Sequence, residues 1–252
     1  DSLKESGDYC QLRDELAKNG KNLQGIAAYD GKQKVWATEL ATEKAVREIA
    51  VGDALKGIVA RKKRVKSGVY FGLLDAFRKA NPDSAYASKA AAEMKPIEAS
   101  LEALFAKIAS YEELGDVHSK YQAIKEAKSE YAKIPAFDEA HKKWTAESRT
   151  PEVRQAMAAG TAYVAIFDDV AKLDRRLKSS LDKNMRISGR HRRTQADNRA
   201  RIGHERKLKP LAAKLRALAK KYAGGYYGIA AERSLEAYRK SEGKALPDGR
   251  EK

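Results

Sequence analysis

The stretch from Lys172 to Lys221, KLDRRLKSSLDKNMRISGRHRRTQADNRARIGHERKLKPLAAKLRALAKK, decides how the chain is expected to fold. It holds 18 lysines and arginines but only four carboxylates, at Asp174, Asp182, Asp197 and Glu205. The resulting net charge of +14 is nearly all of the +16 carried by the whole chain. Such a local cationic charge implies a polyanionic partner more strongly than uniform basicity does, because it concentrates the electrostatic field over one surface.

Apolar residues on both sides of this charge predict a helical hairpin. The second arm has a coiled-coil-like seam, with spacings that alternate between three and four residues, at Leu208, Leu211, Leu215, Leu218 and Tyr222. The first arm begins at Thr150-Pro151-Glu152, which supplies a hydroxyl cap, a proline at the first helical position and a carboxylate near the positive end of the helix dipole. Its apolar residues continue at helical spacing through Leu181. We expect the two arms to be antiparallel.

The segment between the arms, Arg186 to Arg206, has few apolar residues. The positions that would extend the seam are polar: His191, Thr194, Asn198 and His204. Such a segment cannot bury a conventional core, so we expect either a charged loop or the tip of the hairpin.

This tip is the predicted binding site for a polyanion. Its expected contact residues are Arg186, Arg190, Arg192, Arg193, Arg199, Arg201, Arg206 and Lys207. Nothing in the residues selects among nucleic acid, an acidic polysaccharide and an anionic membrane surface. Aromatic residues are absent from Lys172 to Lys221, which disfavours sequence-specific recognition of single strands. The alternative is that these charges form only a solvated helix face.

The composition of the chain predicts an all-α protein. Ala, Lys, Glu, Leu and Arg dominate, with only six prolines and 8% aromatic residues. We expect about eight or nine helices in antiparallel hairpins, arranged as a tetratricopeptide-like solenoid or as an irregular bundle. The expected regions are 1–149 and 150–252, although the two could form one continuous domain.

Local signals place the remaining helices and their ends. Helices are expected over Asp8–Asn19, Val35–Lys66, Tyr70–Asn81, Asp83–Leu114, Asp116–Lys133 and Tyr226–Arg239, with a short one around Phe137. Gly20 is expected to end the first helix, and Lys21–Lys32 to be the least helical segment. Pro96 is expected to kink or restart its helix, and Gly243–Lys252 to be a frayed tail.

Two helix junctions resemble those of tetratricopeptide-type helical repeat proteins of bacterial cell envelopes. They are Phe77–Ala90 (FRKANPDSAYASKA) and Tyr222–Ala230 (YAGGYYGIA). The resemblance implies stacked hairpins that serve as a non-enzymatic scaffold for binding another protein. The second junction has glycines in place of the proline, and no regular copies of a repeat of about 34 residues fill the interval. An irregular bundle therefore stays an alternative.

No catalytic or metal-binding constellation is evident, so we expect neither an enzyme nor a cofactor. No two of the histidines at 118, 141, 191 and 204 have the spacing of helical metal ligands. Asp168, Asp169 and Asp174 form DDxxxxD, which resembles the diphosphate motif of prenyl-transferring helical enzymes. They should instead pair with Lys172 and Lys178 at i+4. A helical enzyme that uses these carboxylates and a sequence-nonspecific nucleic-acid-binding protein are the alternative functions.

Other features limit the compartment without fixing it. Cys10 is the one cysteine, so no disulfide can form within the chain. No apolar run approaches the roughly 20 residues that a membrane-spanning helix requires. The first residue is Asp1 in place of Met, which indicates a processed or truncated chain. We therefore favour a periplasmic or secreted protein, with a cytoplasmic one as the alternative.

Overall fold

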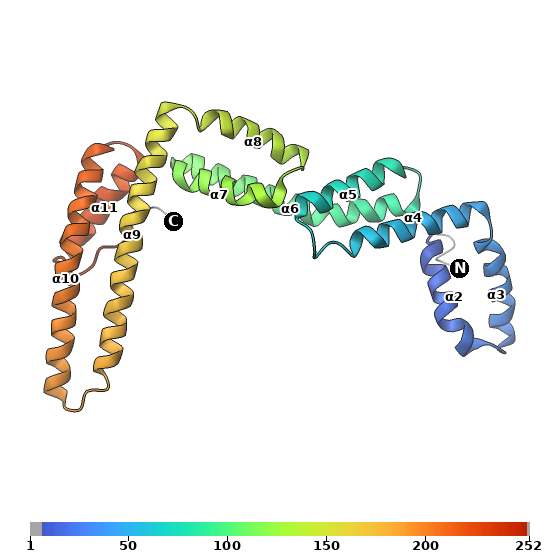
Figure 1. Ribbon diagram of the computed structural model, residues 1–252, viewed down its shortest axis with the longest axis horizontal. Coiled ribbons are helices and arrows are strands. Elements are labelled where there is room, and N and C mark those ends of the chain that lie inside the picture. The colour runs from blue at the N-terminus through green and yellow to red at the C-terminus, as the bar shows by residue number, and fades with distance from the viewer. Residues whose placement is uncertain (1–6, 251–252) are drawn as a thin grey trace. The chain divides into compact units, whose positions relative to one another are not determined.

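The computed structural model describes residues 7–250, and every regular element in that part of the chain is an α-helix (Figure 1). The all-α prediction is therefore confirmed. The helices are α2 (Tyr9–Leu23), α3 (Ala27–Leu40), α4 (Glu43–Val59), α5 (Ser67–Ala80), α6 (Ala85–Leu114), α7 (Val117–Tyr131), α8 (Pro135–Glu147), α9 (Pro151–Asn184), α10 (Arg190–Lys221) and α11 (Tyr226–Lys240). Among the described residues, no helix is both long and apolar enough to cross a membrane.

The described residues divide into two compact units. The first unit holds residues 7–105 and 126–141, and the second holds 106–125 and 142–250. Thr150, the first residue of the expected region 150–252, lies within the second unit and is the N-cap of α9.

Several helix boundaries in the first unit differ from those expected. α2 continues through Gly20 to Leu23, and α2 and α3 together cover most of the segment that was expected to be least helical. The single helix expected from Val35 to Lys66 is two helices, because Thr42 caps α4 by accepting a hydrogen bond of 3.2 Å from the Ala45 N–H. The helix is therefore interrupted at residues 41–42, between two stretches that each have helical periodicity.

Proline did not end the helices in which it lies. α6 runs through Pro96 as one helix, and α10 runs through Pro210. Pro96 therefore does not restart its helix. Helical turns continue on both sides of Pro96. The proline has no backbone N–H, so one helical hydrogen bond is missing, but the helix is not divided into two.

The core of the second unit lies where α9, α10 and α11 meet. Tyr163 on α9, Leu208 and Leu215 on α10 and Ala231 on α11 are fully buried in one cluster. The leucine seam predicted for the second arm is therefore buried as expected, and it packs against the arm that begins at Pro151.

The segment after α11 is packed, which corrects the expectation of a frayed tail. Leu246 is buried in the same core cluster. The Tyr163 hydroxyl donates a hydrogen bond of 2.9 Å to Asp248 and accepts one of 2.9 Å from the Gly249 N–H. A Cβ atom at Gly249 would lie 2.2 Å from the Ala230 carbonyl oxygen, so only glycine allows this close approach.

The basic hairpin tip as a candidate polyanion-binding site

The predicted binding residues lie at the end of a hairpin formed by α9 and α10. The two helices run side by side to a short turn, residues 185–189, at one end of the hairpin (Figure 1). Gly189 precedes α10 with a φ of 93°, a conformation that favours glycine. From Arg190 onward the segment is helical, so the open choice between a charged loop and a hairpin tip is decided in favour of the tip.

Burial in the hairpin decreases from the stem to the tip. His204 is the last buried residue of α10 toward the turn, and its Nε2 lies 2.8 Å from Asp174 Oδ1 on α9. Further out, the Asn184 side-chain amide donates a hydrogen bond of 3.0 Å to Asp197. None of the residues 171–203 is buried. We define this distal part of the hairpin, residues 174–203, as the basic tip.

The basic tip and the first residues beyond it carry cations that have no ionic partner. All eight predicted contact residues are exposed, and none of them forms an ion pair with any carboxylate among residues 7–250. Two of the four nearby carboxylates, Asp174 and Asp197, have hydrogen bonds to His204 and Asn184. Residues 174–207 hold 12 lysines and arginines against these four carboxylates, so the tip keeps a net positive charge.

Some cations of the first unit, by contrast, are paired with carboxylates. Arg13 donates bonds of 2.7 and 2.9 Å to the two carboxylate oxygens of Asp53, and this contact lowers the pKa of Asp53 to about 2. Lys62 lies 2.8 Å from Glu93. Such pairing consumes the ability of a cation to bind a second anion, and it is missing among the eight contact residues.

The start of α10 adds to the positive potential. Its first turn has neither a side-chain cap nor an acidic residue, although Arg190 and Arg192 lie within it. The N-terminus of a helix has a partial positive charge, so both arginines lie where cations are unfavourable and anions are favourable. Arg192, Arg199 and Arg206 follow at intervals of seven residues, which places them on one face about 10.5 Å apart.

The three aspartates of the DDxxxxD motif do not converge. Asp169 lies 3.1 Å from Lys172, whereas the expected partner of Lys172 was Asp168. Asp174 pairs with His204 on the other arm, and not with Lys178. The ion pairs of these aspartates therefore differ from the i+4 pairs that their spacing predicted. In the described part of the chain, no three His, Cys, Asp or Glu side chains come together in a way that could hold a metal ion.

A second candidate is a cavity of about 760 Å³ between α2, α4 and α6 in the first unit. Asp8 and Tyr86 meet there at 2.8 Å, and Lys89 forms an ion pair with Asp8. Burial, and then Asp8, raise the pKa of Tyr86, which keeps its hydroxyl protonated and unsuited to act as a general base. The Tyr86 oxygen also accepts a hydrogen bond of 2.9 Å from the Cys10 N–H, so this cluster secures the start of α2.

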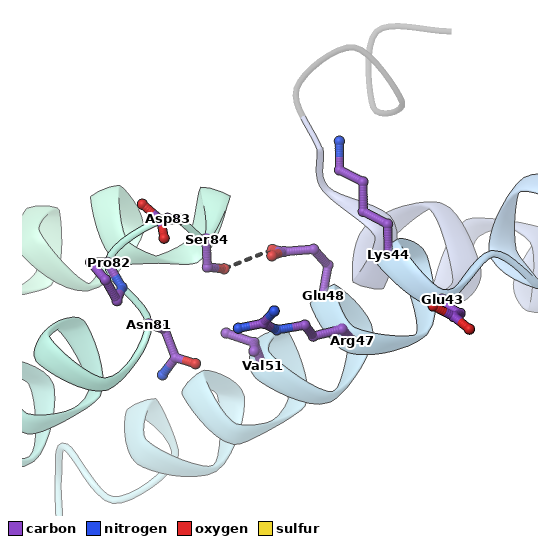
Figure 2. Close-up of a pocket in the computed structure, with 9 residues that line it drawn as sticks. All are labelled: Glu43, Lys44, Arg47, Glu48, Val51, Asn81, Pro82, Asp83 and Ser84. Atoms are coloured by element: carbon purple, nitrogen blue, oxygen red, sulfur yellow. Dashed lines mark hydrogen bonds between the residues drawn. The ribbon is translucent and has the colours of Figure 1, made fainter.

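A third candidate is a cavity of about 390 Å³ between α4 and the junction of α5 with α6. Figure 2 shows Ser84 pointing toward Glu48, to which its hydroxyl donates a hydrogen bond of 2.7 Å, and Arg47 extending from α4 toward the junction. Ser84 also accepts a hydrogen bond of 3.2 Å from the Tyr86 N–H at the start of α6. The serine therefore links the start of α6 to α4 at this junction.

Sequence reasoning missed both cavities of the first unit. Asp8 and Tyr86 are 78 residues apart, and neither belongs to a spaced motif. No family model matches the chain, and no curated protein or solved structure matches it either. The basic tip is thus identified by its charge and exposure alone.

Proposed function

We propose that the protein is a non-enzymatic binding protein whose basic hairpin contacts a polyanion. One observation carries this proposal: the eight exposed cations from Arg186 to Lys207 have no carboxylate partner among the described residues. A helix that only required solubility would carry carboxylates between its cations, because like charges at i+4 spacing destabilise it.

The chemistry of these side chains favours contact with a charged backbone over readout of a sequence. Seven of the eight are arginines, whose planar guanidinium groups match the oxygen spacing of phosphate and sulfate. The tip has no phenylalanine, tyrosine or tryptophan on which bases could stack. Nucleic acid, acidic polysaccharide and anionic membrane surfaces all present the anions that such a tip would bind.

The test is binding to heparin and to duplex DNA across a salt series. For duplex DNA, log K should fall with log salt by about 0.9 for each phosphate that is neutralised. The Arg190→Ala, Arg192→Ala, Arg193→Ala variant should bind more weakly and with a flatter slope. Vesicles with anionic lipids, in the same buffers, identify which of the three surfaces is bound most tightly.

A matched control variant exists in the first unit. Arg61, Lys63 and Arg64 are also exposed and close together at the end of α4, so replacing them with alanine removes the same charge. This control should bind as the unaltered protein does. If both triple variants lose equal affinity, the binding reflects net charge, and the tip is not a site.

The scaffold part of the proposal rests on the two helix junctions that resemble those of helical repeat proteins. Exposed alanine-lined helix faces in the second unit support it further. The alternative of a sequence-nonspecific nucleic-acid-binding protein predicts much tighter binding to duplex DNA than to heparin of similar charge density. Equal binding to both favours a general polyanion contact.

A further inference from the structure

The hairpin has a second surface that the polyanion contact does not use. A groove of about 390 Å³ lies between α9 and α10 on the stem side of the basic tip. We define it by its lining residues: Ala162, Ala165, Ile166, Asp169, Lys214, Ala217, Leu218, Lys221 and Tyr222. Tyr163 is buried beside Ala162, and it contacts Tyr227 and Ser234 of α11. The neighbouring groove residues therefore form a separate face of the stem.

The floor of this groove is apolar and shallow. Ile166 and Leu218 are buried, whereas Ala162, Ala165 and Ala217 are exposed. Alanine at these positions lets the backbone of another helix approach closely, since no longer side chain separates them. α9, α10 and α11 form three packed helices, so a helix in the groove would be the fourth.

The charges around the groove favour a partner of negative charge. Lys214 and Lys221 line the groove seven residues apart on α10, and neither pairs with a carboxylate in the part of the chain that the structure describes. Asp169 is the one carboxylate that lines the groove, and Lys172 lies 3.1 Å from it. The margin of the groove is therefore cationic, which favours an acidic occupant.

We propose that this groove binds an acidic amphipathic helix of a partner protein. The apolar face of that helix would pack on the alanines, and its glutamates or aspartates would lie beside Lys214 and Lys221, as in other complexes of helices in grooves. A second copy of this chain fits poorly, because the two cationic margins would repel each other. The inference rests on the scaffold part of the proposed function and does not depend on the polyanion contact.

The probe is a synthetic peptide of three heptads, labelled for fluorescence anisotropy, with leucine at positions a and d and glutamate at e and g. A second peptide with lysine in place of glutamate is its control. The full-length protein should bind the acidic peptide at least tenfold more tightly than the basic one.

Two pairs of substitutions distinguish the groove from the rest of the hairpin. Ala165→Gln with Ala217→Gln fills the groove without changing the charge, and should weaken binding of the acidic peptide at least tenfold. Ala171→Gln with Ala213→Gln alters exposed alanines of the same two helices that do not line the groove, and should leave binding unchanged. Circular dichroism should show that both variants are folded.

A charge reversal gives an independent readout. Lys214→Glu with Lys221→Glu should reverse the preference, so that the basic peptide binds more tightly than the acidic one. Equal affinity of the unaltered protein and the groove-filling variant would overturn the inference. So would a dimer in sedimentation equilibrium that the groove-filling variant dissociates, since a second copy would then be the occupant.

The tip variant separates this inference from the polyanion contact. The Arg190→Ala, Arg192→Ala, Arg193→Ala protein should keep its affinity for the acidic peptide while losing affinity for heparin. If this variant loses the peptide and the groove-filling variant does not, the peptide binds at the tip as a polyanion. That result refutes the groove and leaves the proposed polyanion contact intact.

Discussion

At the scale of single residues, one buried tyrosine links the start of α2 to α6. The Tyr86 hydroxyl donates to Asp8 and accepts from the Cys10 N–H, and Gly52 makes room for it. A Cβ atom at Gly52 would lie 2.5 Å from Cys10 Sγ and 2.7 Å from the Tyr86 ring. A side chain at position 52 would therefore displace the Tyr86 ring from the position in which its hydroxyl makes these two hydrogen bonds.

Replacing Tyr86 with phenylalanine should destabilise the first unit. The change leaves the Cys10 N–H and the Asp8 carboxylate each without one hydrogen bond, which costs about 1–3 kcal/mol of unfolding free energy. Urea unfolding followed by the fluorescence of Trp36, which packs against the cluster of Tyr9 and Leu12, measures this loss. An unchanged free energy of unfolding would show that water replaces the Tyr86 hydroxyl as a hydrogen-bond partner of Asp8 and the Cys10 N–H.

Stability should also fall in acid through Asp8. Burial raises the pKa of this carboxyl, but hydrogen bonds from Lys89, Tyr86 and the Gln11 N–H outweigh burial and lower the pKa below its ordinary value. The ionised carboxylate therefore stabilises the folded state above the unfolded pKa of about 4, and this contribution is lost as the pH falls through the folded pKa. In Asp8→Asn the dependence of unfolding free energy on pH below 4 should be weaker than in the unaltered protein.

At the scale of helices, the hairpin has a stable stem and a weak tip. Leu215 is fully buried in the stem, whereas Leu181 is only partly buried near the turn. Leu215→Ala should therefore cost about 2–5 kcal/mol of unfolding free energy, and Leu181→Ala much less. Hydrogen exchange should show the lowest protection of the two arms near residues 185–203. Equal costs for the two substitutions would contradict a core confined to the stem.

The first turn of α10 should show a conflict between stability and binding. Arg192→Glu places a carboxylate where the helix N-terminus is positive, and should stabilise the hairpin by about 0.3–1 kcal/mol. The same change should weaken heparin binding, because it removes one cation and adds an anion at the tip. Thermal unfolding and heparin affinity, measured on one preparation, test both directions. A less stable variant would mean that Arg192 has a folded-state partner.

The helices show which sequence signals were sufficient and which were not. Thr150-Pro151 and the leucine seam predicted α9 and α10, because each signal is local and agrees with the burial of the stem. The break before Thr42 was missed, since Leu40 and Val46 suggest one continuous apolar stripe. The packed C-terminal segment could not be inferred, because the contact of Asp248 with Tyr163 spans 85 residues. The tip was found from charge, but its helical form depends on the pairing of two arms.

At the scale of the whole molecule, charge is distributed unevenly. Ion pairs occupy some cations of the first unit, such as Arg13 and Lys62, whereas the eight predicted contact residues on the hairpin of the second unit have no carboxylate partner among residues 7–250. Like charges at the tip repel one another most at low salt, because the Debye length is about 30 Å at 0.01 M and about 10 Å at 0.1 M.

Salt should therefore stabilise the unaltered protein more than the variant with alanine at 190, 192 and 193. The comparison cancels the screening of ion pairs elsewhere, which acts equally on both proteins. Thermal unfolding at 0.01 and 0.1 M salt, followed by circular dichroism, gives the two shifts. A larger gain for the variant would show that the tip cations do not repel in the folded state.

The turn at residues 185–189 has a consequence for the covalent chain. Its two arms are held together by Tyr163, Leu208 and the other buried residues of the stem, and not by the peptide bonds of the turn. Limited digestion with trypsin, which cuts after exposed arginine, should sever the backbone at Arg186, and the segments on the two sides of this cut should still elute as one particle. We therefore expect the stem to stay folded in a circularly permuted chain whose ends lie in this turn, and in a chain with a reporter domain inserted there.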